Sequence, residues 1–124
     1  MVEKKRLEIV MPDWDDEDPI DEEPEWFKTR VKASQVKAGR GTVAHAGILK
    51  VALFRLRDGI VAIKNACPHA GAPLSGGQCR GDLVTCPRHG WAFNVRTGAC
   101  LSRPMYEVKS YQVKVVDGVV WVAV

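Results

Sequence analysis

Two short clusters of cysteine and histidine are the residues of this sequence with the clearest chemical potential. Cys67 and His69 form one cluster and Cys86 and His89 the other, with sixteen residues between His69 and Cys86. Proline and glycine surround both clusters, so we expect each cluster in a tight loop and not inside a helix or strand. Two such loops, each with one thiolate and one imidazole, can close around a single metal site.

Two thiolates and two imidazoles suit either a tetrahedral zinc ion or an iron–sulfur cluster in which histidine replaces cysteine on one iron. Zinc fingers usually pair cysteine with cysteine and histidine with histidine. Here each loop mixes the two types, as C-x-H and C-x-x-H. That order lets both sulfurs reach one metal and both imidazoles reach a second. The pattern favours the iron–sulfur cluster, and a structural zinc module that acts as an interaction domain is the alternative.

A resemblance to a known family rests on the loop sequences CPHAGAPLSGG, which begins at Cys67, and CPRHGWAFNVRTG, which begins at Cys86. Both are similar to the ligand loops of Rieske [2Fe–2S] proteins, and the resemblance extends over residues 25–124. It implies one [2Fe–2S] cluster per chain, with Cys67 and Cys86 on an inner iron and His69 and His89 on an outer iron near solvent. It also implies a third loop over the cluster, in the region of Pro104.

The sequence departs from the high-potential branch of that family at four positions. Those relatives have two further loop cysteines that form a disulfide, where this chain has Ala72 and Arg88. They also have a serine and a tyrosine that donate to cluster sulfur, where this chain has Trp91 and Phe93. Hydrogen bonds to sulfur stabilise the more negative reduced state. We therefore expect membership of the low-potential branch, with a reduction potential of roughly −150 mV.

An all-β fold is predicted from Trp26 onward, because short β-branched runs alternate with turn residues, among them Asp58-Gly59 and Asp117-Gly118. The expected architecture is a small antiparallel β-sandwich or barrel with an inserted cluster-binding β-subdomain at about residues 65–104. Cys79 and Cys100 are expected there as small buried hydrophobic residues, and a disulfide between them is the alternative. Strands are predicted over residues 26–31, 42–46, 48–56, 60–64, 82–86, 91–95, 106–116 and 119–124, and a helical turn over residues 34–37.

The formal charge of +3 conceals two oppositely charged parts of the chain. Residues 1–25 hold eleven acids and three bases, a net −8, whereas residues 26–124 hold four acids and fifteen bases, a net +11. We expect residues 1–24 to form an acidic, flexible tail and residues 25–124 to form the Rieske domain. A sharper hypothesis is that the tail folds back on the basic body. The basic body suggests docking on an acidic partner surface, and no nucleic-acid module is recognised.

A chain of 124 residues is too short to add an oxygenase catalytic domain to a Rieske domain. His45, the one histidine outside the two loops, is expected on a surface strand and indicates no second metal site. With no apolar run long enough for a membrane span and no signal peptide, we expect a cytoplasmic protein.

The resemblance implies a monomeric Rieske-type ferredoxin without catalysis of its own. Such a protein carries one electron from a flavin-dependent reductase to a terminal oxygenase or similar enzyme. The alternative that the same resemblance allows is a small electron-transfer subunit of a nitrite-reductase-like complex.

Overall fold

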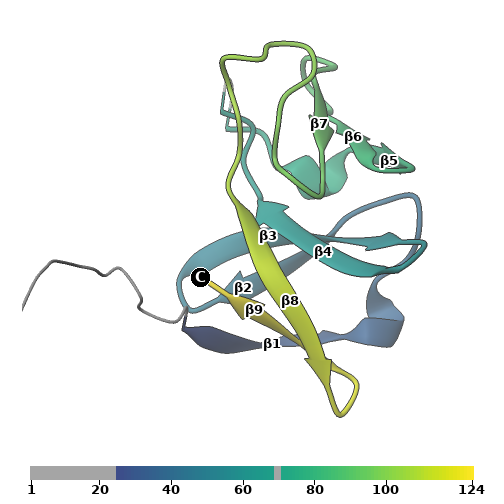
Figure 1. Ribbon diagram of the computed structural model, residues 1–124, viewed down its shortest axis with the longest axis vertical. Helices are drawn as coiled ribbons and strands as arrows, with labels where there is room; N and C mark the ends of the chain where they lie inside the picture. Colours follow the sequence, from purple (N-terminus) through teal and green to yellow (C-terminus); the bar gives the residue numbers. More distant parts are fainter. Residues whose placement is uncertain (1–24, 69–70) are drawn as a thin grey trace, which may run out of the picture.

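The computed structural model describes residues 25–68 and 71–124, which form two stacked lobes (Figure 1). The larger lobe is a six-stranded antiparallel sheet with the order β1-β9-β8-β4-β3-β2. It contains β1 (Trp26–Lys32), β2 (Thr42–Ala46), β3 (Leu49–Leu56), β4 (Gly59–Lys64), β8 (Ser110–Val116) and β9 (Val119–Ala123). The smaller lobe is the sheet of β5 (Gln78–Arg80), β6 (Leu83–Thr85) and β7 (Ala92–Asn94). The predicted all-β fold with an inserted subdomain between β4 and β8 is confirmed.

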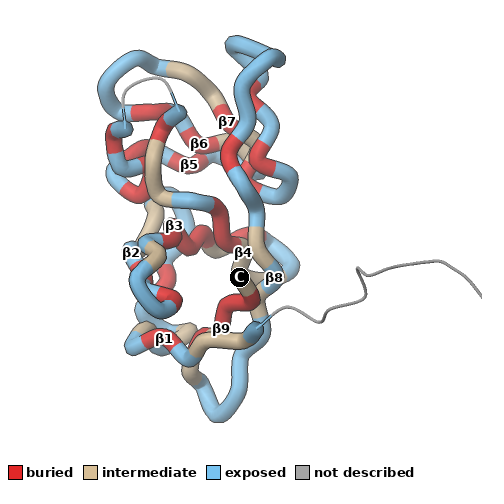
Figure 2. The backbone as a smooth tube through the Cα atoms, turned by 90° about the vertical axis from the view of Figure 1, so that its left-hand side faces the viewer, coloured by how far each residue is buried: buried red, intermediate tan, exposed pale blue. Residues whose placement is uncertain are grey.

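The larger sheet curls into a nearly closed barrel, in which the six strands surround buried residues (Figure 2). Its two end strands, β1 and β2, lie next to each other but share no hydrogen-bonded ladder. The barrel is filled by apolar residues that alternate with exposed ones along the strands, as a half-buried sheet requires. The buried members of this core are Val36, Ala44, Ala46, Val51, Leu53, Ala62, Val120 and Val122.

Strand β3 is the wall that the two lobes share. Val51 and Leu53 face the barrel core, whereas Ala52, Phe54 and Leu56 face the core of the small lobe. Successive side chains of a strand point to opposite faces of the sheet, so a strand covered on both faces must be apolar at every position. This explains the nearly continuous apolar run of β3 and fixes the small lobe on the outside of the barrel.

The hairpin between β8 and β9 follows the prediction closely. Asp117 has φ +52° and Gly118 has φ +78°, the two positive φ values that a two-residue type I′ turn requires. The strand predicted to begin at Tyr106 begins instead at Ser110. The residues before Ser110 bond within the small lobe instead, since the Tyr106 N–H donates to the Arg103 carbonyl at 2.9 Å and the Val108 N–H to the Gly98 carbonyl at 2.8 Å.

Two short elements of the small lobe were not predicted. They are the strand β5 and a 3-10 turn, η3 (Leu74–Gly76), each of three residues. The predicted helical turn near residue 34 is also a 3-10 turn, η2 (Ala33–Gln35). Over the described residues, no helix has both the length and the apolar character that crossing a membrane demands.

Candidate metal centre

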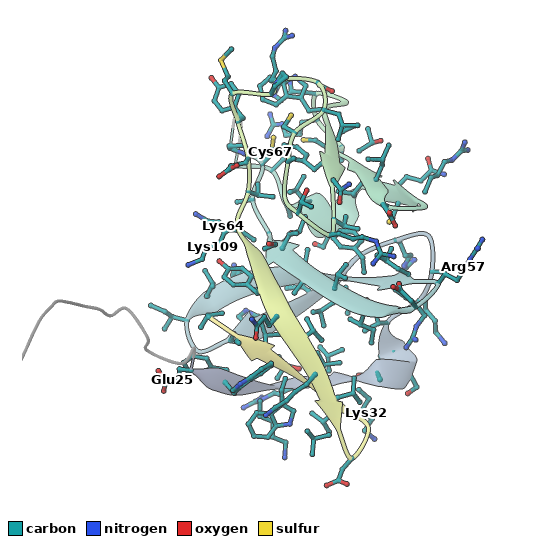
Figure 3. The ribbon with its side chains drawn as sticks, viewed as in Figure 1. Glu25, Lys32, Arg57, Lys64, Cys67 and Lys109 are labelled. Atoms are coloured by element: carbon teal, nitrogen blue, oxygen red, sulfur yellow. The ribbon has the colours of Figure 1, made fainter. Side chains whose placement is uncertain are left out.

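The first cysteine loop is held by two backbone hydrogen bonds at Cys67. The Cys67 N–H donates to the Ala72 carbonyl at 2.8 Å, and the Cys67 carbonyl accepts from the Gly71 N–H at 2.7 Å. Gly71 has φ +69°, a left-handed conformation that glycine adopts without steric cost. The backbone therefore reverses directly after Cys67, which lies in the small lobe above β4 (Figure 3).

The second loop repeats this pattern at the same spacings. The Cys86 N–H donates to the Trp91 carbonyl at 2.7 Å, and the Cys86 carbonyl accepts from the Gly90 N–H at 2.9 Å. Gly90 has φ +73°. The loop is the tip of the β6–β7 hairpin, as predicted. Two loops with the same pair of backbone hydrogen bonds thus each begin at a cysteine.

The two cysteine thiols lie together in the interior. Cys67 and Cys86 are each 1% exposed and belong to the core of the small lobe. Burial of Cys86 favours its neutral thiol. The backbone N–H groups of His89 and Arg88, the Cys67 thiol and the Arg88 charge outweigh that effect, and together they hold the Cys86 pKa below its ordinary value of 9.0. The environment therefore favours the thiolate, which is the form that binds metal.

The imidazole of the second loop has the opposite environment. His89 is exposed at the hairpin tip, three residues beyond the buried Cys86. The site is therefore asymmetric, with sulfur inside and nitrogen at the surface. His69, the remaining predicted ligand, lies outside the described residues.

A third segment, between β7 and β8, packs on the second loop. The rings of Trp91 and Tyr106 lie 5.3 Å apart, and the Arg103 guanidinium lies 5.7 Å from the centre of the Trp91 ring. The Ser102 hydroxyl accepts a hydrogen bond from the Ala92 N–H at 3.1 Å. These contacts place the segment around Pro104 beside the second cysteine loop, where the resemblance predicted a third loop.

Two of the four positions that differ from the high-potential branch carry apolar side chains in the core of the small lobe. Ala72 and Phe93 are 4% and 0% exposed, and neither side chain has a hydrogen-bond donor. Cys79 and Cys100 are buried and form no disulfide, as predicted. His45 is an exposed residue of β2, also as predicted.

Comparison with known proteins identifies the family. The sequence model of the protein family described as the Rieske [2Fe-2S] domain matches residues 25–112 of this chain. The chain belongs to the Rieske [2Fe–2S] family. Buried paired thiols with an exposed imidazole fit the cluster of that family, in which histidine replaces cysteine on one iron. The cofactor is thus a Rieske-type [2Fe–2S] cluster, and the family predicted from the loop sequences is confirmed.

The relatives that this chain covers almost completely include a ferredoxin. It is 34% identical over 99 residues to ferredoxin CarAc of Metapseudomonas resinovorans, a match that covers 79% of this chain and 92% of the relative. The chain is a Rieske-type ferredoxin, as the resemblance implied.

Two solved structures share the fold. A Mycobacterium tuberculosis protein assigned as the small subunit of an NADH-dependent nitrite reductase has a TM-score of 0.73 and 32% identity, with 83% of this chain and 97% of that chain covered. A ferredoxin in a complex with the oxygenase of carbazole 1,9a-dioxygenase has a TM-score of 0.69 and 36% identity, with 79% and 92% covered.

Proposed function

We propose that this ferredoxin accepts one electron from a flavoprotein reductase and delivers it to a terminal oxygenase or a similar oxidoreductase. The observation that carries the proposal is the asymmetric site, with buried thiols at Cys67 and Cys86 and an exposed imidazole at His89. The similar ferredoxin found in a complex with its oxygenase supports an acceptor of the same class.

We assign Cys67 and Cys86 to the inner iron and His69 and His89 to the outer iron. The thiolate-favouring surroundings of Cys86 and the matching turns of the two loops support this ligand set. When bound, the cluster takes up and releases one electron. Neutral imidazole in place of anionic thiolate makes that uptake easier. Because His89 is exposed, its ring provides a short route between the site and a docked partner.

Exposed basic residues lie on the loops of the small lobe and at its base. Arg88 and Arg103 are exposed on the second and third loops. Lys64 and Lys109 are exposed near the base of the small lobe, where the Lys64 N–H donates to the Lys109 carbonyl at 2.9 Å (Figure 3). Opposite charges on a partner would accelerate its encounter with this surface. We therefore propose that donor and acceptor dock through acidic surfaces, and that the chain acts in the cytoplasm as a monomer without catalysis of its own.

A second candidate is a small subunit of a nitrite-reductase-like complex. The observation that favours it is the TM-score of 0.73 to a nitrite reductase small subunit of which 97% is covered. Purification from the native host separates the two functions, because a permanent subunit remains in a stable stoichiometric complex whereas a shuttle elutes as a free monomer.

Anaerobic titration with dithionite tests the carrier function directly. We expect each chain to take up one electron reversibly, with the EPR signal of a reduced Rieske cluster. We also expect the reduced protein to be reoxidised on mixing with the oxygenase of the same host. A colourless protein that contains zinc, or one that cannot be reoxidised by any such acceptor, would overturn the proposal.

A further inference from the structure

The open side of the barrel carries a groove. It lies between residues of β1 and β2. These strands are the two ends of the sheet order and lie next to each other without a hydrogen-bonded ladder (Figure 2). Its volume is about 460 Å³, and its lining includes Lys28 and Arg30 from β1 and Val43 and His45 from β2. We call it the seam groove. The site with the cysteine loops uses none of these residues.

The seam groove is cationic. Lys28 and Arg30 are exposed and flank Thr29, which is buried and whose hydroxyl donates to the Val120 carbonyl at 2.7 Å. Both basic side chains therefore leave the strand on its outer face. Neither β1 nor β2 contains an acidic residue. Within residues 25–68 and 71–124, carboxylates form ion pairs with Arg96 but not with Lys28 or Arg30.

The seam groove continues along the outer face of the barrel. Val43 and His45 also line a second groove of about 520 Å³, which runs past Lys50 and Asn65 to Pro73. Val43 is 44% exposed, so the two grooves together offer an apolar contact as well as positive charge. An extended acidic peptide with some apolar residues matches these properties.

The chain itself contains such a peptide directly before β1 in the sequence. Residues 13–24 hold eight acids and no base, together with Trp14 and Ile20. The Glu25 carbonyl accepts from the Val124 N–H at 3.1 Å, which fixes the end of this segment at the start of β1. Twelve extended residues span about 40 Å, whereas the seven residues of β1 span roughly 23 Å. The segment is therefore long enough to reverse its direction and run back along β1.

We propose that the acidic segment of residues 13–24 binds in the seam groove of the same chain, with its carboxylates against Lys28 and Arg30. The covalent link gives this segment a high local concentration that a separate acidic partner or a second copy lacks. When bound there, the segment neutralises part of the net positive charge of residues 26–124. Because the ion pairs are exposed to solvent, the contact must weaken as salt is added.

Carbodiimide crosslinking of the full-length holoprotein tests the contact. The reagent joins a lysine directly to a carboxylate, so at low salt we expect Lys28 to be linked to acids of residues 13–24. The link should be lost at about 0.5 M salt. A mixture of ¹⁴N and ¹⁵N chains reports whether both crosslinked peptides come from one chain. Links that join different chains, or that reach the exposed Lys37 as often as Lys28, would overturn the proposal.

Amide hydrogen exchange in two charge-reversal variants is the second test of the contact. In Lys28→Glu/Arg30→Glu, we expect amide exchange in residues 13–24 to rise about fivefold, the size expected when two exposed ion pairs are lost. The matched control is Lys37→Glu/Arg57→Glu, which changes the net charge equally at exposed residues outside the seam groove. In this control variant, we expect the amides of residues 13–24 to exchange at the wild-type rate. Equal exchange in both variants, or no response of the wild type to salt, would contradict the proposal. Retained visible absorption verifies that each variant holds its cluster.

Discussion

Arg96 forms a two-point ion pair with Asp58 across the junction of the two lobes, with nitrogen–oxygen distances of 2.8 and 3.2 Å. Asp58 lies in the β3–β4 turn of the barrel, whereas Arg96 follows β7 in the small lobe. Arg96 also pairs with Asp82 in the β5–β6 turn, at 3.1 Å. The side chains are 39–67% exposed. The network therefore orients the small lobe on the barrel more than it stabilises the fold.

The ion pair predicts a pH dependence. The hydrogen bond from Arg96 is the main reason that the pKa of Asp58 lies below its ordinary value of 3.8. A carboxyl with a depressed folded-state pKa stabilises the fold above the ordinary pKa and loses this effect as the pH falls through the lowered value. Asp58→Asn should therefore unfold at slightly lower temperature than wild type at pH 7, and the difference should shrink as the pH falls below 3.8.

Thermal unfolding followed by circular dichroism, at low and high salt, measures this difference. The control is Asp117→Asn, which alters a carboxylate in the distant β8–β9 turn and should leave the pH dependence unchanged. A difference between Asp58→Asn and wild type that does not shrink as the solution is acidified would show that Asp58 acts through something other than its charge.

The ligand assignment predicts which side chains the cluster needs. Cys67→Ala, Cys86→Ala, His69→Ala and His89→Ala should each abolish almost all cluster binding, because one missing ligand exposes an iron. Iron and sulfide analysis with visible absorption measures the loss. The matched controls are Cys79→Ala and His45→Ala, which remove the same residue types elsewhere and should keep full cluster content. Normal cluster content in any of the four ligand variants would refute the assignment.

Gly98 predicts a steric effect. It has φ +84°, and a Cβ atom at this position would collide with the Val108 carbonyl oxygen. Gly98→Ala should therefore cost more than about 2 kcal/mol in unfolding free energy. Gly81 is the control, because it has φ +58° but open space around the added Cβ. Gly81→Ala should cost only about 1 kcal/mol. If urea denaturation gives the same loss of unfolding free energy for both variants, the segment near Val108 moves to accommodate the new methyl group.

Strand β3, which the two lobes share, predicts that cavities on its two faces affect cluster binding differently. Phe54 is 0% exposed and packs in the core that contains both loop cysteines. Phe54→Ala should lower the unfolding free energy by about 3–5 kcal/mol through the cavity that it leaves. It should also release the cluster at a lower urea concentration. Leu53→Ala leaves a cavity on the barrel side, so its cluster loss should coincide with global unfolding and not precede it.

Local patterns predicted much of this fold. The turn pair Asp117-Gly118 and the β-branched runs located the barrel strands within a few residues, because a hairpin turn has its own local sequence pattern. Asp58-Gly59 marked the β3–β4 hairpin one residue too late, since Leu56 pairs with Gly59 and the loop residues are Arg57 and Asp58. The turns of the two cysteine loops were also predicted, because their proline and glycine residues form short local patterns. In contrast, β5 and η3 were missed, since three-residue elements carry too short a pattern to detect.

Features that depend on distant residues could not be predicted. The barrel seam between β1 and β2, the Arg96 network and the close approach of Gly98 to Val108 each join segments that no sequence pattern links. The burial of β3 on both faces had a signal in its continuous apolar run, but the run alone does not say which lobe covers which face.

The surroundings of the cluster predict its reduction potential. Phe93 and Ala72 lack side-chain donors, and the resemblance places a tyrosine hydroxyl that donates to sulfur at position 93 in high-potential relatives. We expect a wild-type midpoint potential of roughly −150 mV. Phe93→Tyr should raise it by roughly 40 mV, because one new hydrogen bond of about 1 kcal/mol would favour the reduced state of a one-electron couple. Protein-film voltammetry measures both values. Tyr106→Phe, which removes a hydroxyl from the partner ring of Trp91, should leave the potential unchanged. A clearly positive wild-type potential would mean that groups other than these side chains control the cluster.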